Sequence, residues 1–181
     1  MKYLDQKRLL YIGRHCHLYF KLMLYICNIR AMVCKIREGK DIKINDFPCF
    51  VIGCKYGAIW ALGHSKQCHK KLRYHHSHCT SISSALCSAQ KNIVSHTKTK
   101  ERLYWGSCAE DYAASHVLKQ FAKKYPRKNL PALKNLDFTL PIRPRTLETH
   151  PMCTVCKILF EEKYLCFDNE WVNTFFTNNK L

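Results

Sequence analysis

The order in which helical and strand patterns follow one another is the strongest constraint on the fold of this chain. A helical pattern is followed by two strands, a helix, a strand, a short helix and two further strands. Strands that alternate with helices favour one sheet covered by helices over an all-helical or all-β fold. We therefore expect an α/β fold with a mixed sheet and an N-terminal helical extension.

The extension comprises residues 1–44, and the domain that follows comprises residues 45–181. Over about residues 1–40, apolar residues are interleaved with Lys and Arg, which is typical of one or two amphipathic helices. A basic amphipathic helix could lie on a membrane surface. We favour the alternative that it packs on the domain that it precedes.

The first two strands are predicted to form a β-hairpin. The short apolar runs Phe47–Gly53 and Ala58–Leu62 are separated by Cys54-Lys55-Tyr56-Gly57, in which Gly57 supplies the turn. Residues 63–100 follow as a polar stretch rich in Ser, His and Lys. Its length is unusual for a loop inside a compact domain, so we interpret it as a basic, His- and Cys-rich insertion or a functional segment.

The second half of the chain holds the clearest helical pattern, followed by shorter elements. The expected elements are a helix from about Ser107 to Lys124, a strand at Leu136–Ile142, a short helix starting at Pro151, and a closing hairpin of Lys163–Phe167 and Trp171–Phe176.

Charge and cysteine content narrow the function. Thirty Lys and Arg against thirteen acids give a formal charge of +17, which favours nucleic acid, nucleotides or an acidic protein as partner. The sequence contains no run of eighteen apolar residues, so we expect no transmembrane segment. The N-terminal sequence does not have the pattern of a secretory signal, so we expect the protein to be cytoplasmic, or delivered by a non-classical route. The twelve cysteines are then expected to be reduced thiols or metal ligands.

Three cysteines have the spacing of a metal site. Cys153 and Cys156 stand three residues apart at an expected helix start, close enough to hold one metal ion. Cys108 falls at the expected start of the preceding helix. Three thiolates on Zn²⁺ carry a net charge of −1, which the positive ends of two helices would offset. Cys108, Cys153 and Cys156 are therefore the predicted zinc ligands.

Glu110 is the candidate catalytic residue. Three protein ligands leave the fourth zinc position for water, which the metal would activate and whose proton a carboxylate must carry away. Glu110 lies two residues from a predicted ligand and shares a helical stripe with Ala114, Leu118 and Phe121. A carboxylate on a core-facing stripe is desolvated, which raises its pKa toward values useful for acid–base chemistry.

Each motif also has a structural interpretation. Ser107 and Glu110 fit a capping box, in which the Glu side chain bonds back to the Ser amide. Cys153 and Cys156 could be core thiols, or half of a structural site that a histidine completes. Because the motifs occur together and in this order, we favour the catalytic interpretation.

The segments Ser107-Cys108-Ala109-Glu110 and Pro151–Cys156 resemble the motifs of the zinc-dependent cytidine deaminase-like superfamily, and most of all its YwqJ-related toxin deaminases. The resemblance covers about residues 45–176. It implies a five-stranded mixed sheet sandwiched by helices, zinc on the three cysteines and Glu110 as the proton shuttle.

The resemblance further implies hydrolytic deamination of a nucleobase, in nucleic acid or in a nucleotide, with release of ammonia. It also implies a toxin or effector, with an immunity or inhibitor protein as a further partner. The alternative from another class is a non-catalytic nucleic-acid-binding module with one or two structural zinc ions.

A second group of metal-binding residue types lies in the insertion: His64, Cys68, His69, His75, His76, His78 and Cys79. Their spacing matches no zinc-finger pattern, and lysines surround them. We favour a solvated basic loop over a second zinc site.

Two further features could contact nucleic acid. Trp105 and Tyr104 could stack on a base, although core aromatics are the commoner explanation. The basic run of Lys123, Lys124, Arg127 and Lys128 is expected to be a solvated helix end that could also guide a polyanion.

Overall fold

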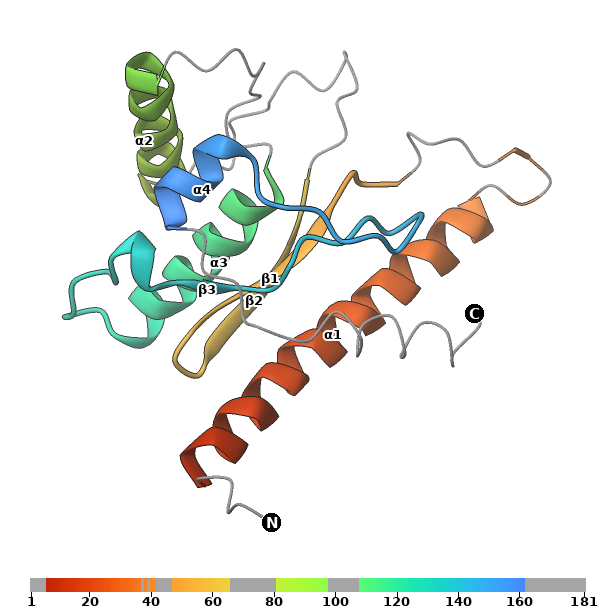
Figure 1. Ribbon diagram of the computed structural model, residues 1–181, viewed down its shortest axis with the longest axis horizontal. Coiled ribbons are helices and arrows are strands. Elements are labelled where there is room, and N and C mark those ends of the chain that lie inside the picture. The colour runs from red at the N-terminus through yellow and green to blue at the C-terminus, as the bar shows by residue number, and fades with distance from the viewer. Residues whose placement is uncertain are drawn as a thin grey trace.

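The computed structural model describes residues 6–36, 38, 40–41, 47–65, 81–97 and 108–161. In chain order the elements are α1 (Gln6–Ile36), β1 (Val51–Tyr56), β2 (Ile59–His64), α2 (Ser81–Thr97), α3 (Ala109–Lys124), the 3-10 helix η3 (Leu133–Asn135), β3 (Asp137–Phe138) and α4 (Thr154–Phe160). Helices and a sheet together confirm the α/β class (Figure 1).

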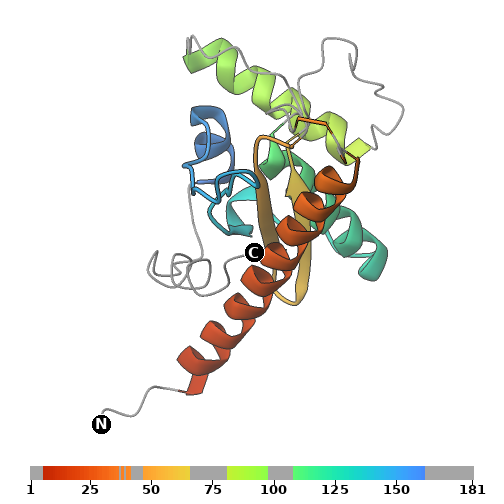
Figure 2. The ribbon, with the colours of Figure 1, turned by 90° about the vertical axis from the view of Figure 1, so that its right-hand side faces the viewer.

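The sheet lies between two helical layers. Its three strands have the order β2-β1-β3, and β1 runs antiparallel to both neighbours. Helix α1 crosses one face of the sheet and α3 covers the other (Figures 1 and 2). Strand β1 is therefore buried on both faces, which explains why its sequence is a continuous apolar run broken only by Gly53 and Lys55.

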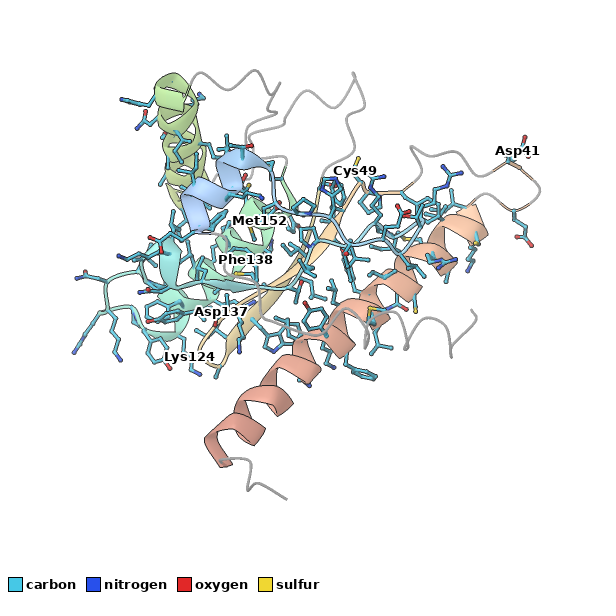
Figure 3. The ribbon with its side chains drawn as sticks, viewed as in Figure 1. Asp41, Cys49, Lys124, Asp137, Phe138 and Met152 are labelled. Atoms are coloured by element: carbon cyan, nitrogen blue, oxygen red, sulfur yellow. The ribbon has the colours of Figure 1, made fainter. Side chains whose placement is uncertain are left out.

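One hydrophobic core fills the space between the sheet and α3. Ile52 and Cys54 of β1 point into it, as do Ile59 and Ala61 of β2. Helix α3 supplies small and branched side chains, and the segments around β3 and α4 close the core with Phe138, Met152, Cys156 and Phe160. Phe138 and Met152 lie between β1 and α4 (Figure 3).

A second core lies between the sheet and α1. Leu22, Ile26 and Ile29 of α1 pack against Val51 and Ile142. In addition, the backbone amide of Leu140 donates a hydrogen bond of 3.2 Å to the Tyr19 hydroxyl. The expected N-terminal helix is thus confirmed, and it packs on the sheet. No helix among the described residues is both long and apolar enough to cross a bilayer.

Strands β1 and β2 form the predicted hairpin. Two residues connect them, and Gly57 at the first turn position has a φ of +57°. A glycine there is typical of a type II′ turn, whose twist matches that of the strands. The pairing extends from Tyr56–Ile59 at the turn to Val51–His64, so the strands start and end a few residues later than predicted.

Gly63 of β2 sets the distance between the hairpin and α3. A Cβ atom at this position would lie 2.4 Å from the Ala109 carbonyl oxygen and 2.6 Å from the Ala113 amide nitrogen. Both neighbours are backbone atoms of the first turns of α3. The absence of a side chain at Gly63 is therefore what lets the start of α3 lie directly on β2.

The polar stretch after the hairpin contains a helix that the sequence analysis did not predict. Residues 81–97 form α2, which contacts α3 and α4. Its side chains Leu86 and Gln90 are buried, and Ile82 packs against the core beside α3. The expectation of a long loop over residues 63–100 is therefore wrong for this part.

Two further features of the described residues differ from expectation, and a third expected element cannot be compared. The predicted strand over Leu136–Ile142 is regular only at β3, because one extra residue lies between the bonds of Thr139 to Gly53 and those of Ile142 to Val51. Such a bulge suits Pro141, which lacks an amide proton. The described sheet has three strands, all antiparallel, where five in a mixed sheet were expected. The closing hairpin predicted after Lys163 lies outside the described residues.

Candidate metal centre

The three cysteines predicted as zinc ligands lie together. The sulfur atoms of Cys108, Cys153 and Cys156 all lie within 4.8 Å of one another, although 45 residues separate the first from the second. Cys108 and Cys153 are half-buried and Cys156 is buried. Among the described residues this is the one group of His, Cys, Asp or Glu side chains close enough to hold a metal ion. Their role as ligands stays a prediction.

Helix ends explain how the cysteines converge. Cys108 is the N-cap of α3, and Cys153 is the N-cap of α4, with Cys156 in the first turn of α4. The prediction that the short helix starts at Pro151 is wrong, since this helix, α4, begins three residues later at Thr154. The Cys153 sulfur accepts a hydrogen bond of 3.4 Å from the Cys156 amide, and this cap fixes the start of the helix.

The sulfur positions fit a tetrahedral metal site. Zinc–sulfur bonds of about 2.3 Å place the sulfurs of a tetrahedral site about 3.8 Å apart. Cys108 Sγ and Cys153 Sγ are 3.9 Å apart. A set of three thiols is also soft, which suits zinc better than magnesium or calcium. The chemistry of the donor set suits a soft divalent metal ion such as zinc, and the distance between Cys108 and Cys153 agrees with tetrahedral spacing.

The pKa values of the three thiols differ. Thiol hydrogen bonds from Cys108 and Cys156, followed by backbone amides of α4, lower the pKa of Cys153 to about 3. The hydrogen bond to Cys153 raises the pKa of Cys108, and hydrogen bonds to the other two thiols, together with burial, raise the pKa of Cys156. Cys108 and Cys156 therefore hold their protons more tightly than Cys153 does, so binding of a divalent cation would release protons.

Glu110 lies on the core-facing stripe of α3, as predicted. It is 6% exposed, and Ala114, Leu118 and Phe121 of the same stripe are also buried. Burial raises the pKa of Glu110 to about 8, a hydrogen bond from its own amide acts in the opposite direction, and the charges of Cys153 and Asp111 add to the increase. A carboxyl group in this setting can both accept and donate a proton near neutral pH.

The capping-box interpretation of Glu110 does not fit the start of α3. In a capping box the glutamate is the third residue after the N-cap. Here the N-cap is Cys108, so Glu110 is the second residue of the helix. Ser107, the other partner of the box, lies outside the described residues.

Asp111 is a buried acid beside the three cysteines. It was not among the predicted site residues. It is 5% exposed, and its Oδ2 accepts a hydrogen bond from Gln90 Nε2 of α2. Its Oδ1 has no hydrogen-bond partner. An acid in the first turn of a helix is common for electrostatic reasons, so only the position of α2 reveals that this one is buried.

Asp111 should make the metal-free protein less stable at higher pH. Burial raises the pKa of Asp111 to about 7, the Gln90 bond acts in the opposite direction, and Cys153 adds to the increase. The unfolded chain releases this proton near pH 4, so the free energy of unfolding falls as pH rises from about 4 to 7. In the Asp111→Asn variant the fall should be smaller.

Urea unfolding at pH 5 and pH 8 in the presence of EDTA measures this difference. The exposed Asp41 gives a matched control, Asp41→Asn, which should behave as the wild type. An unchanged difference between the two pH values in Asp111→Asn would contradict the assignment. Glu110 titrates over a similar range, so part of the slope should remain.

Most of the other candidate residues lie outside the described part of the chain. In the insertion, His64 is described at the end of β2, where its ring lies 5.2 Å from that of Tyr112 and 6.4 Å from that of Tyr25. The other members of that cluster, from Cys68 to Cys79, lie outside the described residues, as do Tyr104 and Trp105. The basic run Lys123, Lys124, Arg127 and Lys128 is exposed, as expected for a solvated helix end.

Comparison with known proteins adds no assignment. No protein-family model, no curated protein and no solved structure matches this chain. The candidate function therefore depends on the geometry of the site and on the resemblance of two short motifs.

Proposed function

We propose that this chain is a zinc-dependent hydrolytic deaminase that acts on a nucleobase in nucleic acid or in a nucleotide. The observation that carries the proposal is the meeting of three cysteine sulfurs, within 4.8 Å of one another, at the N-termini of α3 and α4. A buried carboxyl group, Glu110, lies in the first turn of α3 two residues from Cys108.

In the proposed reaction the cysteines hold zinc, which when bound supplies a Lewis acid that lowers the pKa of water. Glu110 accepts a proton from the attacking water and donates it to the leaving amino nitrogen. The base loses ammonia and gains a carbonyl oxygen, and the second proton of the water stays on the adjacent ring nitrogen. The desolvated position of Glu110 supports this role, because a carboxylate that is poorly solvated is a stronger base than one in water.

The fold supports the proposal to the extent that it is described. A deaminase-like domain needs a five-stranded sheet, and β2, β1 and β3 would be three of its strands. The remaining two would come from the hairpin predicted at Lys163–Phe167 and Trp171–Phe176. The formal charge of +17 favours a phosphorylated substrate, since phosphates are the commonest anions that basic proteins bind.

Metal analysis tests the first requirement of the proposal. The purified protein should contain one zinc per chain, and Cys108→Ser should contain none, because losing one of three thiolates removes most of the affinity. Cys49→Ser is the matched control, since Cys49 is an exposed cysteine outside the group. Elemental analysis after dialysis against an excess of metal-free buffer measures the number of zinc ions per chain.

The outcomes separate the proposal from its alternative. Zinc retained in Cys108→Ser would contradict a shared site and move the metal to another set of ligands, such as the segment from His64 to Cys79. Zinc lost in the variant is the expected result and leads to a substrate screen with cytosine, adenine and guanine in single-stranded DNA, RNA and nucleotides. A zinc-loaded protein that deaminates none of them would favour the non-catalytic nucleic-acid-binding module.

A further inference from the structure

Strand β2 has one edge that no described strand pairs with. In the described sheet β2 pairs only with β1. The bonding pattern shows which residues face the free edge. Gly53 directs its amide and its carbonyl to Thr139, away from β2, in bonds of 2.8 and 2.9 Å. Its partner across the hairpin, Leu62, is therefore in a non-hydrogen-bonded pair, and the amide and carbonyl of Leu62 face the free edge.

The same alternation applies to Trp60, which is opposite Lys55 and two residues from Leu62. The amides and carbonyls of both residues thus face this edge as a short row of donors and acceptors. No backbone hydrogen bond from another described segment reaches either residue. Such an edge is a template for an additional strand.

A groove of about 580 Å³ runs beside this edge. Residues 58–62 form one wall, and one face of α3 forms the other with His116, Gln120 and Lys124. The groove is separate from the three cysteines, because none of them is among the residues that line it. No acid is among the residues that line it.

The two sides of the edge differ in character. Toward α3 the lining is polar and basic, with His116, Gln120 and Lys124. Toward α1 the lining is apolar: the Trp60 ring lies 5.9 Å from the His17 ring, and Leu62 packs against the core below α1. In an added strand, successive side chains point to opposite faces. One set would meet the basic wall and the other set the apolar side.

We propose that the free edge of β2 binds an extended segment of an acidic partner protein, in which acidic and apolar residues alternate. The exposed backbone row selects an extended peptide over a nucleic acid, since a sugar–phosphate backbone cannot continue a β-ladder. The basic wall and the net charge of +17 select acidic side chains and disfavour a second copy of this chain.

A fluorescent octapeptide of four Val-Glu repeats tests the inference with the full chain. It should bind more tightly than a Val-Lys octapeptide of equal length, and more tightly than a Val-Glu octapeptide with N-methyl groups on alternate residues. N-methylation keeps every side chain but removes the donors for strand pairing. Lys124→Glu should raise the Kd for the Val-Glu peptide at least fivefold. Lys123→Glu makes the same charge change outside the groove, and it should alter the Kd less than twofold.

Amide exchange measured by NMR distinguishes strand addition from simple charge attraction. Exchange of the Trp60 and Leu62 amides should slow at least tenfold with the peptide bound. Binding without this protection, or equal binding of the N-methylated peptide, would overturn the inference. So would displacement of the peptide by a single-stranded oligonucleotide with the same dependence on Lys124, which would make the groove a nucleic-acid site. A dimer that protects the same two amides without peptide would equally contradict it.

Discussion

Under the proposed mechanism, Glu110→Gln should reduce the rate of deamination about a hundredfold or more and leave the proposed zinc bound. The amide keeps the size of the carboxyl group and can still accept the bond from its own backbone amide, but it cannot take up a proton. General acid–base catalysis of this kind contributes about 10²–10⁴ to a rate, which sets the scale of the loss. Ammonia release and base identity by mass spectrometry, on the substrate that the screen identifies, measure the effect.

Two comparisons make this result specific. Glu148→Gln changes an exposed glutamate outside the site and should leave the rate unchanged. Zinc content should be one per chain in both variants. A Glu110→Gln protein that still turns over at the wild-type rate would remove Glu110 from the mechanism. One that loses its zinc would make Glu110 a metal ligand instead of a proton shuttle.

Gly63→Ala should destabilise the fold by about 2–3 kcal/mol or more and release the metal. The added methyl group would lie 2.4 Å from the Ala109 carbonyl oxygen, so the start of α3 must move away from β2. Overpacking of this kind typically costs about 1–3 kcal/mol, and here the obstacle is backbone that cannot rotate aside. Ala109 lies between Cys108 and Glu110, so a displaced α3 also carries Cys108, the proposed ligand, away from Cys153.

Thermal unfolding and zinc content measure the two effects in the same samples. Ala58→Ser is the matched control on the same hairpin, because it adds one atom at an exposed turn position without a positive φ. It should unfold within a few degrees of the wild type and keep one zinc. A Gly63→Ala protein with wild-type stability and wild-type zinc content would mean that α3 does not lie against β2 in solution.

The elements that could be predicted are those with a local signal. The periodicity of α3 located both its span and its buried stripe, and Gly57 located the hairpin turn. Helix α2 was missed because Ser and Ala dominate its sequence, although Ile82, Leu86 and Gln90 recur every four residues. The start of α4 was misplaced because Pro151 suggested a first helical residue, while the cap that Cys153 makes to the Cys156 amide is visible only in three dimensions.

The candidate site could be predicted in its residue types but not in its surroundings. Two helix starts with cysteines indicated that Cys108 would meet Cys153 and Cys156, since thiolates gain from positive helix ends. Nothing local indicates that Gln90, twenty-one residues before Asp111, donates a hydrogen bond to it. Contacts of this kind depend on how α2 packs, and packing is decided by the whole core.

Because both faces of β1 are buried, the chain cannot be shortened from its N-terminus without exposing part of the core. The layer below α1 and the layer below α3 are both built on the same six-residue strand, with Val51 in one core and Ile52 in the other. Neither layer can melt while the other stays intact, so the two should unfold as one cooperative unit. A shortened protein that starts after α1 would leave Val51 and Ile142 open to water, and with them the support on which the cysteine-bearing half rests.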